Sequence, residues 1–171
     1  MAEANAFCCR SRMTQCSYGF YCIIEYIKSK GRTRMQLGTD IIEIERIVEA
    51  SVRQPRFAAK ILTELELEIY NTYSQVRQAS FLAGRFSAKE AYGKALGTGV
   101  GSKLKFTDIT ILPDERGVPV ITNAPFTHPE AKVSISHSRF HATATVIVEL
   151  DDHTLRDRLK EYFSNKKEIN L

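Results

Sequence analysis

Phe81–Gly99 reads FLAGRFSAKEAYGKALGTG, and this segment decides the fold expected for the chain. Its apolar and small residues recur at helical spacing, which predicts one long helix from about residue 78 to residue 96. Gly97 is well placed as the C-cap of that helix, and the run Gly97–Gly101 predicts a loop with free backbone amides. The alanines at 88, 91 and 95 indicate that something packs closely against the helix.

The segments around this helix predict the rest of the architecture. A short strand is expected to end near Ile41, with Asp40 at its C-terminal edge. Helical spacing then predicts short helices over 42–50, 56–62 and 64–73, and Thr63 with Glu66 has the spacing of a capping box. Alternating patterns predict strands over 105–112, 118–122, 132–136 and 142–150. The order strand, helices, strands predicts an α+β fold, with an antiparallel sheet packed against one long helix and shorter helices.

Composition divides the chain into three parts, which we take as 1–34, 35–150 and 151–171. Residues 1–34 hold six basic and two acidic residues and all four cysteines, whereas 35–171 holds 18 basic and 18 acidic residues. We interpret 1–34 as an extension from an upstream start, a cloning remnant or disordered peptide, with a targeting or interaction role as the alternative, and 35–150 as the domain. The charged tail 151–171 is expected to form a surface helix over about 152–165.

This distribution excludes several function classes. The net charge of +4 lies in the extension, so it gives no reason to expect a nucleic-acid partner. The cysteines lack paired zinc-site spacing, and 35–171 has none, which suits a reducing compartment. No apolar run approaches the roughly 20 residues of a membrane span. We therefore expect a cytoplasmic protein.

Three places carry candidate chemistry, and each has a second interpretation. Asp40 follows Gly38 and can reach a ligand, but it can also cap the following helix. Glu90 and Lys94 share a helix face and, with the adjacent loop, can hold Mg²⁺ and phosphates, although they can also form a simple surface ion pair. His137 lies near the end of the alternating run Val133–Ser138, where a histidine can be functional or structural. No GxSxG motif surrounds the serines of that run, which argues against a serine hydrolase.

Together these motifs resemble one family. The chain from about Met35 to Leu150 is similar to the holo-acyl-carrier-protein synthase type of 4′-phosphopantetheinyl transferase. The resemblance rests on GTDIIEIERI at Gly38–Ile47, on the Phe81–Gly99 segment, and on VSISHS at Val133–Ser138. In the family a Gly-x-Gly commonly precedes the aspartate, and here Gln36 stands at the earlier glycine.

The resemblance implies a reaction and its residues. The 4′-phosphopantetheine group of coenzyme A moves to a serine of apo-acyl carrier protein, adenosine 3′,5′-bisphosphate is released, and the product serves fatty acid biosynthesis. It implies that Asp40 and Glu90 bind Mg²⁺, and that Glu90, or a water it orients, accepts the serine proton. Lys94 would lie along the pyrophosphate. Coenzyme A would also contact Gly97, Gly99, Ser136 and His137.

The resemblance also implies partners. Arg46, Arg53 and Arg56 match positions that meet the acidic carrier protein, and a basic cluster in a neutral domain suits that partner. The alternative is a solvated helix face paired with Glu43, Glu45 and Glu49. The family is usually a homotrimer with active sites at subunit interfaces, so His137 would reach the coenzyme from a neighbouring subunit.

Two other functions compete with the transferase. One is a non-catalytic coenzyme A or carrier-protein binding module, which would have no need of Asp40, Glu90 and Lys94 together. The other is a Mg²⁺-dependent phosphoesterase that uses the same carboxylates, for which no residue that positions water stands out.

Overall fold

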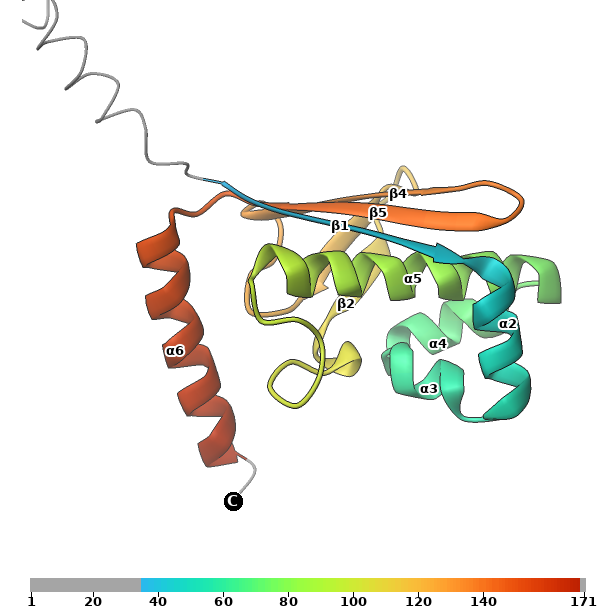
Figure 1. Ribbon diagram of the computed structural model, residues 1–171, viewed down its shortest axis with the longest axis horizontal. Helices are drawn as coiled ribbons and strands as arrows, with labels where there is room; N and C mark the ends of the chain where they lie inside the picture. Colours follow the sequence, from blue (N-terminus) through green and yellow to red (C-terminus); the bar gives the residue numbers. More distant parts are fainter. Residues whose placement is uncertain (1–34, 170–171) are drawn as a thin grey trace, which may run out of the picture. The chain divides into compact units, whose positions relative to one another are not determined.

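The computed structural model describes residues 35–169, with side chains as far as Lys166, so the predictions for 1–34 lie outside the described residues. Figure 1 shows the elements in chain order. They are β1 (Gln36–Glu43), α2 (Ile44–Arg53), α3 (Phe57–Ile61), α4 (Glu64–Asn71), α5 (Gln75–Ala95), the 3₁₀ helix η1 (Phe106–Asp108), β2 (Thr110–Pro113), β3 (Pro119–Asn123), β4 (Ala131–His137), β5 (His141–Val148) and α6 (Asp152–Ile169). The predicted α+β class is confirmed.

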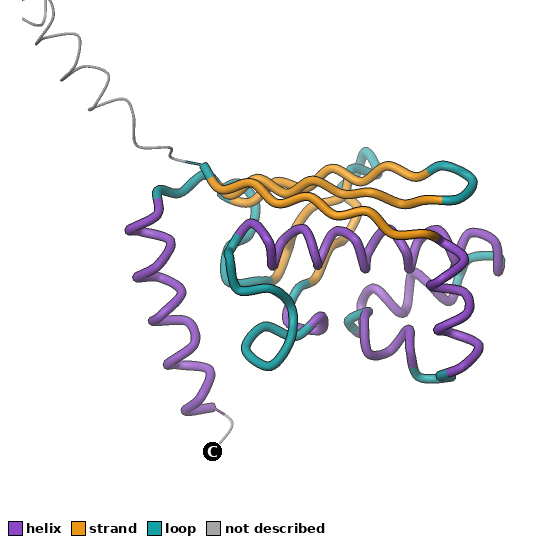
Figure 2. The backbone as a smooth tube through the Cα atoms, in the orientation of Figure 1, coloured by secondary structure: helices purple, strands orange, loops and turns teal. Residues whose placement is uncertain are grey.

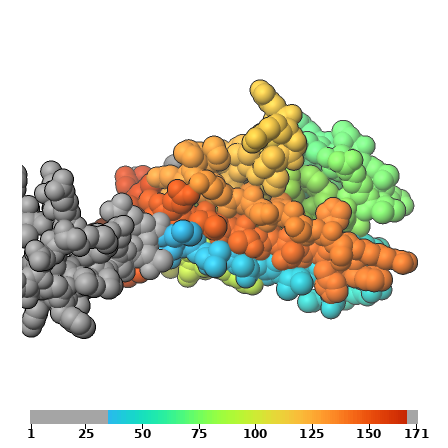
Figure 3. Space-filling view, turned by 90° about the horizontal axis from the view of Figure 1, so that it is seen from above, coloured from blue at the N-terminus to red at the C-terminus, as the bar shows by residue number. Residues whose placement is uncertain are grey.

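The main sheet is antiparallel, with the strand order β1-β5-β4, and β2 and β3 form a separate hairpin. The long helix α5 runs along one face of the three-stranded sheet, and α2, α3 and α4 gather on the same side (Figures 1 and 2). Viewed from above, the three strands lie side by side on the surface of the domain (Figure 3). The outer face of β1 presents Leu37 and Ile41, which are 63% and 65% exposed.

The contact between β1 and α5 is unusually close. A Cβ atom added to Gly38 would lie 2.0 Å from the carbonyl oxygen of Ala91 and 2.5 Å from the amide nitrogen of Ala95. No side chain fits there, so the strand requires glycine at residue 38. The prediction that something packs against the small residues of this helix is confirmed, and β1 is that element.

The core forms two clusters. One lies between α5, the sheet and the β2–β3 hairpin, and includes Tyr92, Ile111 and Val146. The other joins α2, α3 and the first half of α5 through Ile47, Leu62 and other apolar residues. The helix expected near the C-terminus is present as α6, but it is not only a surface helix, because Leu155 and Leu159 are buried in the first cluster.

Two predicted elements have other bounds or another type in the structure. Strand β1 continues to Glu43, which pairs with His141, so α2 begins at Ile44 and not at Ile42. The strand predicted over 105–112 begins instead as η1, because the Asp108 carboxylate accepts the N–H of Lys105 at 2.6 Å and closes a turn. Among residues 35–169, no helix is long and apolar enough to cross a membrane.

Gly38→Ala should therefore destabilise the domain severely. The new methyl group would meet helix backbone, which cannot move aside, so we expect a loss of about 3 kcal/mol or more in the free energy of unfolding. Gly101→Ala is the matched control: a Cβ there meets nothing within 4 Å, and we expect a change within about 0.5 kcal/mol. Urea denaturation measures both, and equal stability of the two variants would contradict the close packing.

Candidate active site

Asp40 lies inside β1, three residues before its end, and not at a strand edge as predicted. Its main-chain carbonyl accepts hydrogen bonds from Ser87 Oγ of α5 at 2.9 Å and from Thr143 Oγ1 of β5 at 2.8 Å. The residue that caps α2 is Glu43, so the alternative role of Asp40 as a helix cap is wrong. The Gly38 contact and these two bonds fix Asp40 against α5.

Lys94 meets Asp40 from the last turn of α5. Its Nζ donates to Asp40 Oδ1 at 2.8 Å, and the Lys94 side chain remains half exposed. Lys94 therefore forms an ion pair between α5 and β1, in place of the simple surface pair with Glu90 that was the alternative. The other carboxylate oxygen, Asp40 Oδ2, is buried and has no hydrogen-bond partner within the described part of the chain.

Glu90 lies one helical turn before Lys94 on α5. Its pKa is raised, first by partial burial and second by the negative charge of Asp40, while Lys94 opposes the rise. Two carboxylates close enough to repel each other, one with an unsatisfied buried oxygen, are suited to a bound cation. Residues 35–169 hold no cluster of three or more His, Cys, Asp or Glu side chains for a metal. One or two carboxylates are the usual protein share of a Mg²⁺ site that also uses phosphate oxygens and water.

The glycine-rich loop after α5 corrects one expectation. Gly97 and Gly99 have positive φ angles of 67° and 62°, as the predicted helix end requires. The loop amides are not free, however. Thr98 and Gly99 donate to Gly93 O, Gly97 donates to Lys94 O, and Gly101 donates to Leu104 O. The loop is held against α5 beside Lys94, and these four amides are already used.

His137 lies in a different place from Asp40, Glu90 and Lys94. It lines a pocket of about 380 Å³ between the end of β4 and the first half of α5. The other lining residues are Tyr73, Arg77, Ser80, Phe81, Gly84, Arg85 and Ile135. Ser136 is exposed on the opposite, outer face of the sheet, as the alternation of Val133–Ser138 predicted. The described part of the chain therefore does not bring His137 and Glu90 into one site.

The two arginines of this pocket were missed from sequence. Arg77 lies over the ring of Tyr73 at 4.1 Å, and Arg85 lies over the ring of Phe81 at 4.4 Å. Each aromatic partner lies four residues before its arginine, on or next to α5. This spacing places both side chains on one helix face, so the sequence does carry a signal for the two pairs. Two cations and apolar rings around one hollow suit a ligand with phosphate and an aromatic base.

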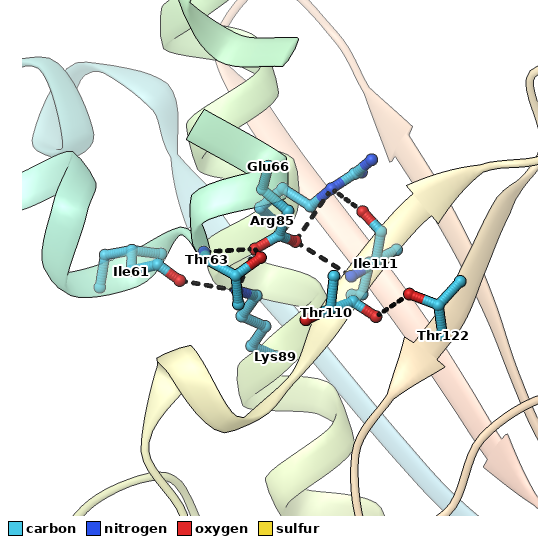
Figure 4. Close-up of polar contacts among 8 residues, drawn as sticks. All are labelled: Ile61, Thr63, Glu66, Arg85, Lys89, Thr110, Ile111 and Thr122. Atoms are coloured by element: carbon cyan, nitrogen blue, oxygen red, sulfur yellow. Dashed lines mark hydrogen bonds and ion pairs between the residues drawn. The ribbon is translucent and has the colours of Figure 1, made fainter. Parts of the chain in front are cut away.

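A buried charge cluster beside the pocket was also missed (Figure 4). Glu66 and Lys89 are fully buried, with 2.5 Å between Lys89 Nζ and Glu66 Oε2, and Lys89 also donates to Ile61 O. Arg85 Nε lies 3.5 Å from Glu66 Oε1. The predicted capping contact exists, since Thr63 N–H donates to Glu66 at 2.9 Å. The spacing of Thr63 and Glu66 predicted the cap. It could not predict that Glu66 is buried, because the burial depends on contacts of α4 with α5 and β2.

The basic residues of α2 and α3 are exposed, as a docking role requires. Arg46, Arg53 and Arg56 all face solvent. Arg53 pairs with Glu49 at 3.2 Å, and both side chains are mostly exposed. The alternative of a solvated, paired helix face therefore holds for Arg53, where such a pair contributes little.

Known proteins are similar to this chain in sequence and fold. Residues 36–155 match the family described as the 4′-phosphopantetheinyl transferase superfamily. Holo-(acyl-carrier-protein) synthases from Streptococcus uberis and an Exiguobacterium species are 51% and 49% identical over 112 and 117 residues, which is 66% and 68% of this chain and 93% of each relative.

Solved structures agree. A holo-(acyl-carrier-protein) synthase from Bacillus anthracis, in complex with CoA (3′,5′-ADP), is 41% identical, has a TM-score of 0.58, and covers 68% of this chain and 96% of its own. The Helicobacter pylori synthase in complex with coenzyme A is 32% identical, has a TM-score of 0.56, and covers 66% and 98%. The chain belongs to the 4′-phosphopantetheinyl transferase superfamily, and within it to the enzymes of the holo-acyl-carrier-protein synthase type.

The raised pKa of Glu90 gives a prediction on stability. Folding disfavours the charged form of Glu90, so its contribution to stability is present at low pH and lost as the pH rises through the raised pKa. Glu90→Gln removes this charge. It should raise the unfolding midpoint of the chelator-treated protein by up to about 3 °C near neutral pH, with little effect near pH 4.

Thermal unfolding in EDTA at both pH values measures this effect. Glu115→Gln, in the exposed turn between β2 and β3, is the control and should leave both midpoints unchanged. A lower midpoint for Glu90→Gln at neutral pH would contradict the idea that the negative charge of Glu90 destabilises the metal-free fold.

Proposed function

We propose that this protein transfers 4′-phosphopantetheine from coenzyme A to a serine of apo-acyl carrier protein, with Mg²⁺, and releases adenosine 3′,5′-bisphosphate. The observation that carries the proposal is the unsatisfied, buried Asp40 Oδ2 beside Glu90 and Lys94 in a chain of this family. The product would serve fatty acid biosynthesis in the cytoplasm.

Asp40 and Glu90 would hold the Mg²⁺. The bound ion supplies positive charge for the pyrophosphate oxygens, where negative charge gathers during transfer. A binding module without turnover would have no use for two carboxylates that repel each other. The same charge arrangement therefore favours an enzyme over the non-catalytic alternative.

The chain's own residues would account for the rest of the transfer. A new bond forms between the carrier serine oxygen and the β-phosphorus of coenzyme A, and the bond to the adenosine bisphosphate oxygen breaks. The serine proton would pass to Glu90 or to a water that Glu90 orients. Lys94 would leave Asp40 Oδ1 and place its ammonium along the pyrophosphate.

Coenzyme A would lie between two subunits. Gly97 and Gly99 would line its path beside Lys94, by close approach of the backbone and not by the amides already bonded. The neighbouring subunit would supply His137 and Ser136, and the pocket cations Arg77 and Arg85 would meet phosphate groups. The exposed apolar residues Leu37 and Ile41 on the open sheet face support association, which we propose gives a homotrimer.

The proposal predicts transfer by a site shared between subunits. Wild-type protein with apo-acyl carrier protein, coenzyme A and Mg²⁺ should add a phosphopantetheine group to the carrier, as measured by mass spectrometry, and EDTA should prevent it. Asp40→Asn and His137→Ala should each lose most activity, at least about 100-fold for Asp40→Asn. Unfolded and refolded together in equal amounts, the two variants should regain roughly a quarter of the wild-type rate, because hybrid interfaces restore intact sites.

Each outcome of that experiment is informative. No mass gain by the wild type would refute the transferase and favour a binding module. Normal transfer by Asp40→Asn would refute the metal assignment. If the wild type transfers the group but the mixture of the two variants regains no activity, Asp40 and His137 would belong to a site within one subunit. Ultracentrifugation should give three times the chain mass of 19.4 kDa.

We also propose that Arg46, Arg53 and Arg56 dock the acidic carrier protein. Arg46→Glu should raise the KM for carrier protein about tenfold and leave the KM for coenzyme A within twofold, because reversed charge opposes an acidic partner. Arg116→Glu, in the exposed β2–β3 turn, is the control and should change neither KM. Equal effects of Arg46→Glu on both substrates would argue against the docking role.

A further inference from the structure

The segment from Gly97 to Asp108 connects the end of α5 to β2, and most of it is exposed irregular backbone. Its start is fixed on α5, where Thr98 and Gly99 donate to Gly93 O beside Lys94. Its middle has one buried side chain, Leu104. Its second half is anchored by Phe106, which stacks on Phe86 of α5 with 5.1 Å between the ring centroids, and by one further element.

Helix α6 is that element. It begins next to β1, where Gln36 Nε2 donates to Asp152 Oδ1 at 2.6 Å, and Arg158 pairs with Glu130 at 2.7 Å. Its buried leucines, Leu155 and Leu159, join the core that contains Leu104. In Figure 1, α6 stands at the end of α5 from which the loop leaves.

Lys166, in the last turns of α6, reaches the loop. Lys166 Nζ donates to the carbonyl oxygen of Lys103 at 3.3 Å and forms an ion pair with Asp108. The two charged side chains are only 24% and 18% exposed. Asp108 also accepts the N–H of Lys105, so the Lys166 ammonium holds the fold of residues 103–108 as a unit.

This contact has a consequence for ligand binding. A loop that is ordered before its ligand arrives spares the entropic cost of ordering it on binding. A partly buried ion pair restrains a loop better than an exposed surface pair does. Most of α6, including Lys166, lies beyond the residues 36–155 that match the family, so this restraint belongs to the part of the chain outside that match.

We infer that α6 preorders the coenzyme A side of the active site, and that Lys166 is its positioning residue. Lys166 does not touch the reacting atoms. It acts through the Gly97–Asp108 loop, and the inference rests on the proposed function of Gly97 and Gly99.

Kinetics with the full-length chain test this role. Lys166→Ala should raise the KM for coenzyme A by about three- to tenfold, while kcat and the KM for carrier protein stay within twofold. Lys166→Arg should restore most of the affinity, because it keeps a cation for Asp108. Lys160→Ala is the control: Lys160 lies on the same helix, is 71% exposed and pairs with Asp157 of α6 itself, so all constants should be unchanged.

Hydrogen exchange and binding separate this inference from the transferase proposal. Amides of residues 97–105 should exchange several-fold faster in Lys166→Ala than in Lys160→Ala, and calorimetry should show weaker coenzyme A binding without any turnover. The charge swap Lys166→Asp with Asp108→Lys should recover part of both properties if the pair itself matters.

Three results would overturn the inference. Lys166→Ala with the constants and exchange rates of Lys160→Ala would show that the loop is held elsewhere. A parallel rise of both KM values, or faster exchange throughout the domain, would show a general effect on stability. Failure of the wild type to transfer phosphopantetheine would refute the proposed function only, because exchange and binding would still decide the role of Lys166.

Discussion

The site depends on the contact of β1 with α5 at Gly38. A strand and a helix usually keep their backbones apart by a layer of side chains, but here a Cβ at Gly38 would lie only 2.0 Å from Ala91 O. The close approach lets Asp40, two residues along the strand, bind Lys94 and raise the pKa of Glu90. With an ordinary side chain at residue 38, the strand would have to move away from the helix, and the carboxylates would separate.

A second constraint sets the rotation of α5 about its own axis. Lys89 is fully buried and bonded to Glu66 and Ile61 O, so this residue of the helix must face α3 and α4. Successive helix residues point about 100° apart. Fixing Lys89 inward therefore directs Glu90 toward β1. Burial lowers the pKa of Lys89 and the charge of Glu66 opposes that change, so Lys89 depends on Glu66 for its charged state.

Most of the helices and strands could be predicted from local sequence patterns, because most of these elements have clear signals. The helix α5, the cap at Thr63, the alternation of β4 and the order of the elements follow from spacing between near neighbours. The errors occurred where distant parts of the chain decide the outcome. Pairing with β5 extends β1 past Asp40, and packing with the core turns α6 from a surface helix into a partly buried one.

The same distinction applies to the site. Asp40, Glu90 and Lys94 could be named from sequence, and the structure brings them together. The Lys94–Asp40 pair, the unsatisfied Asp40 Oδ2 and the bonded amides of the glycine loop could not, since each needs the contact between β1 and α5 or the turn after it. The pocket arginines needed the packing of β4 on the first half of α5, where a Cβ on Gly84 would lie 3.1 Å from Ile135.

Helix α5 contributes to two sites at once, and this follows from its length. Its first half presents Arg77 and Arg85 to the pocket with His137, and its last turns present Glu90 and Lys94 to Asp40. A helix of 21 residues is about 30 Å long, so no single bound phosphate group can touch both ends. In the proposed assembly, the His137 end of α5 would serve one coenzyme A and the Glu90 end another, each completed by another subunit. The rigid helix, held by the Glu66 cluster near its centre, would then fix the spacing between neighbouring sites in an assembly.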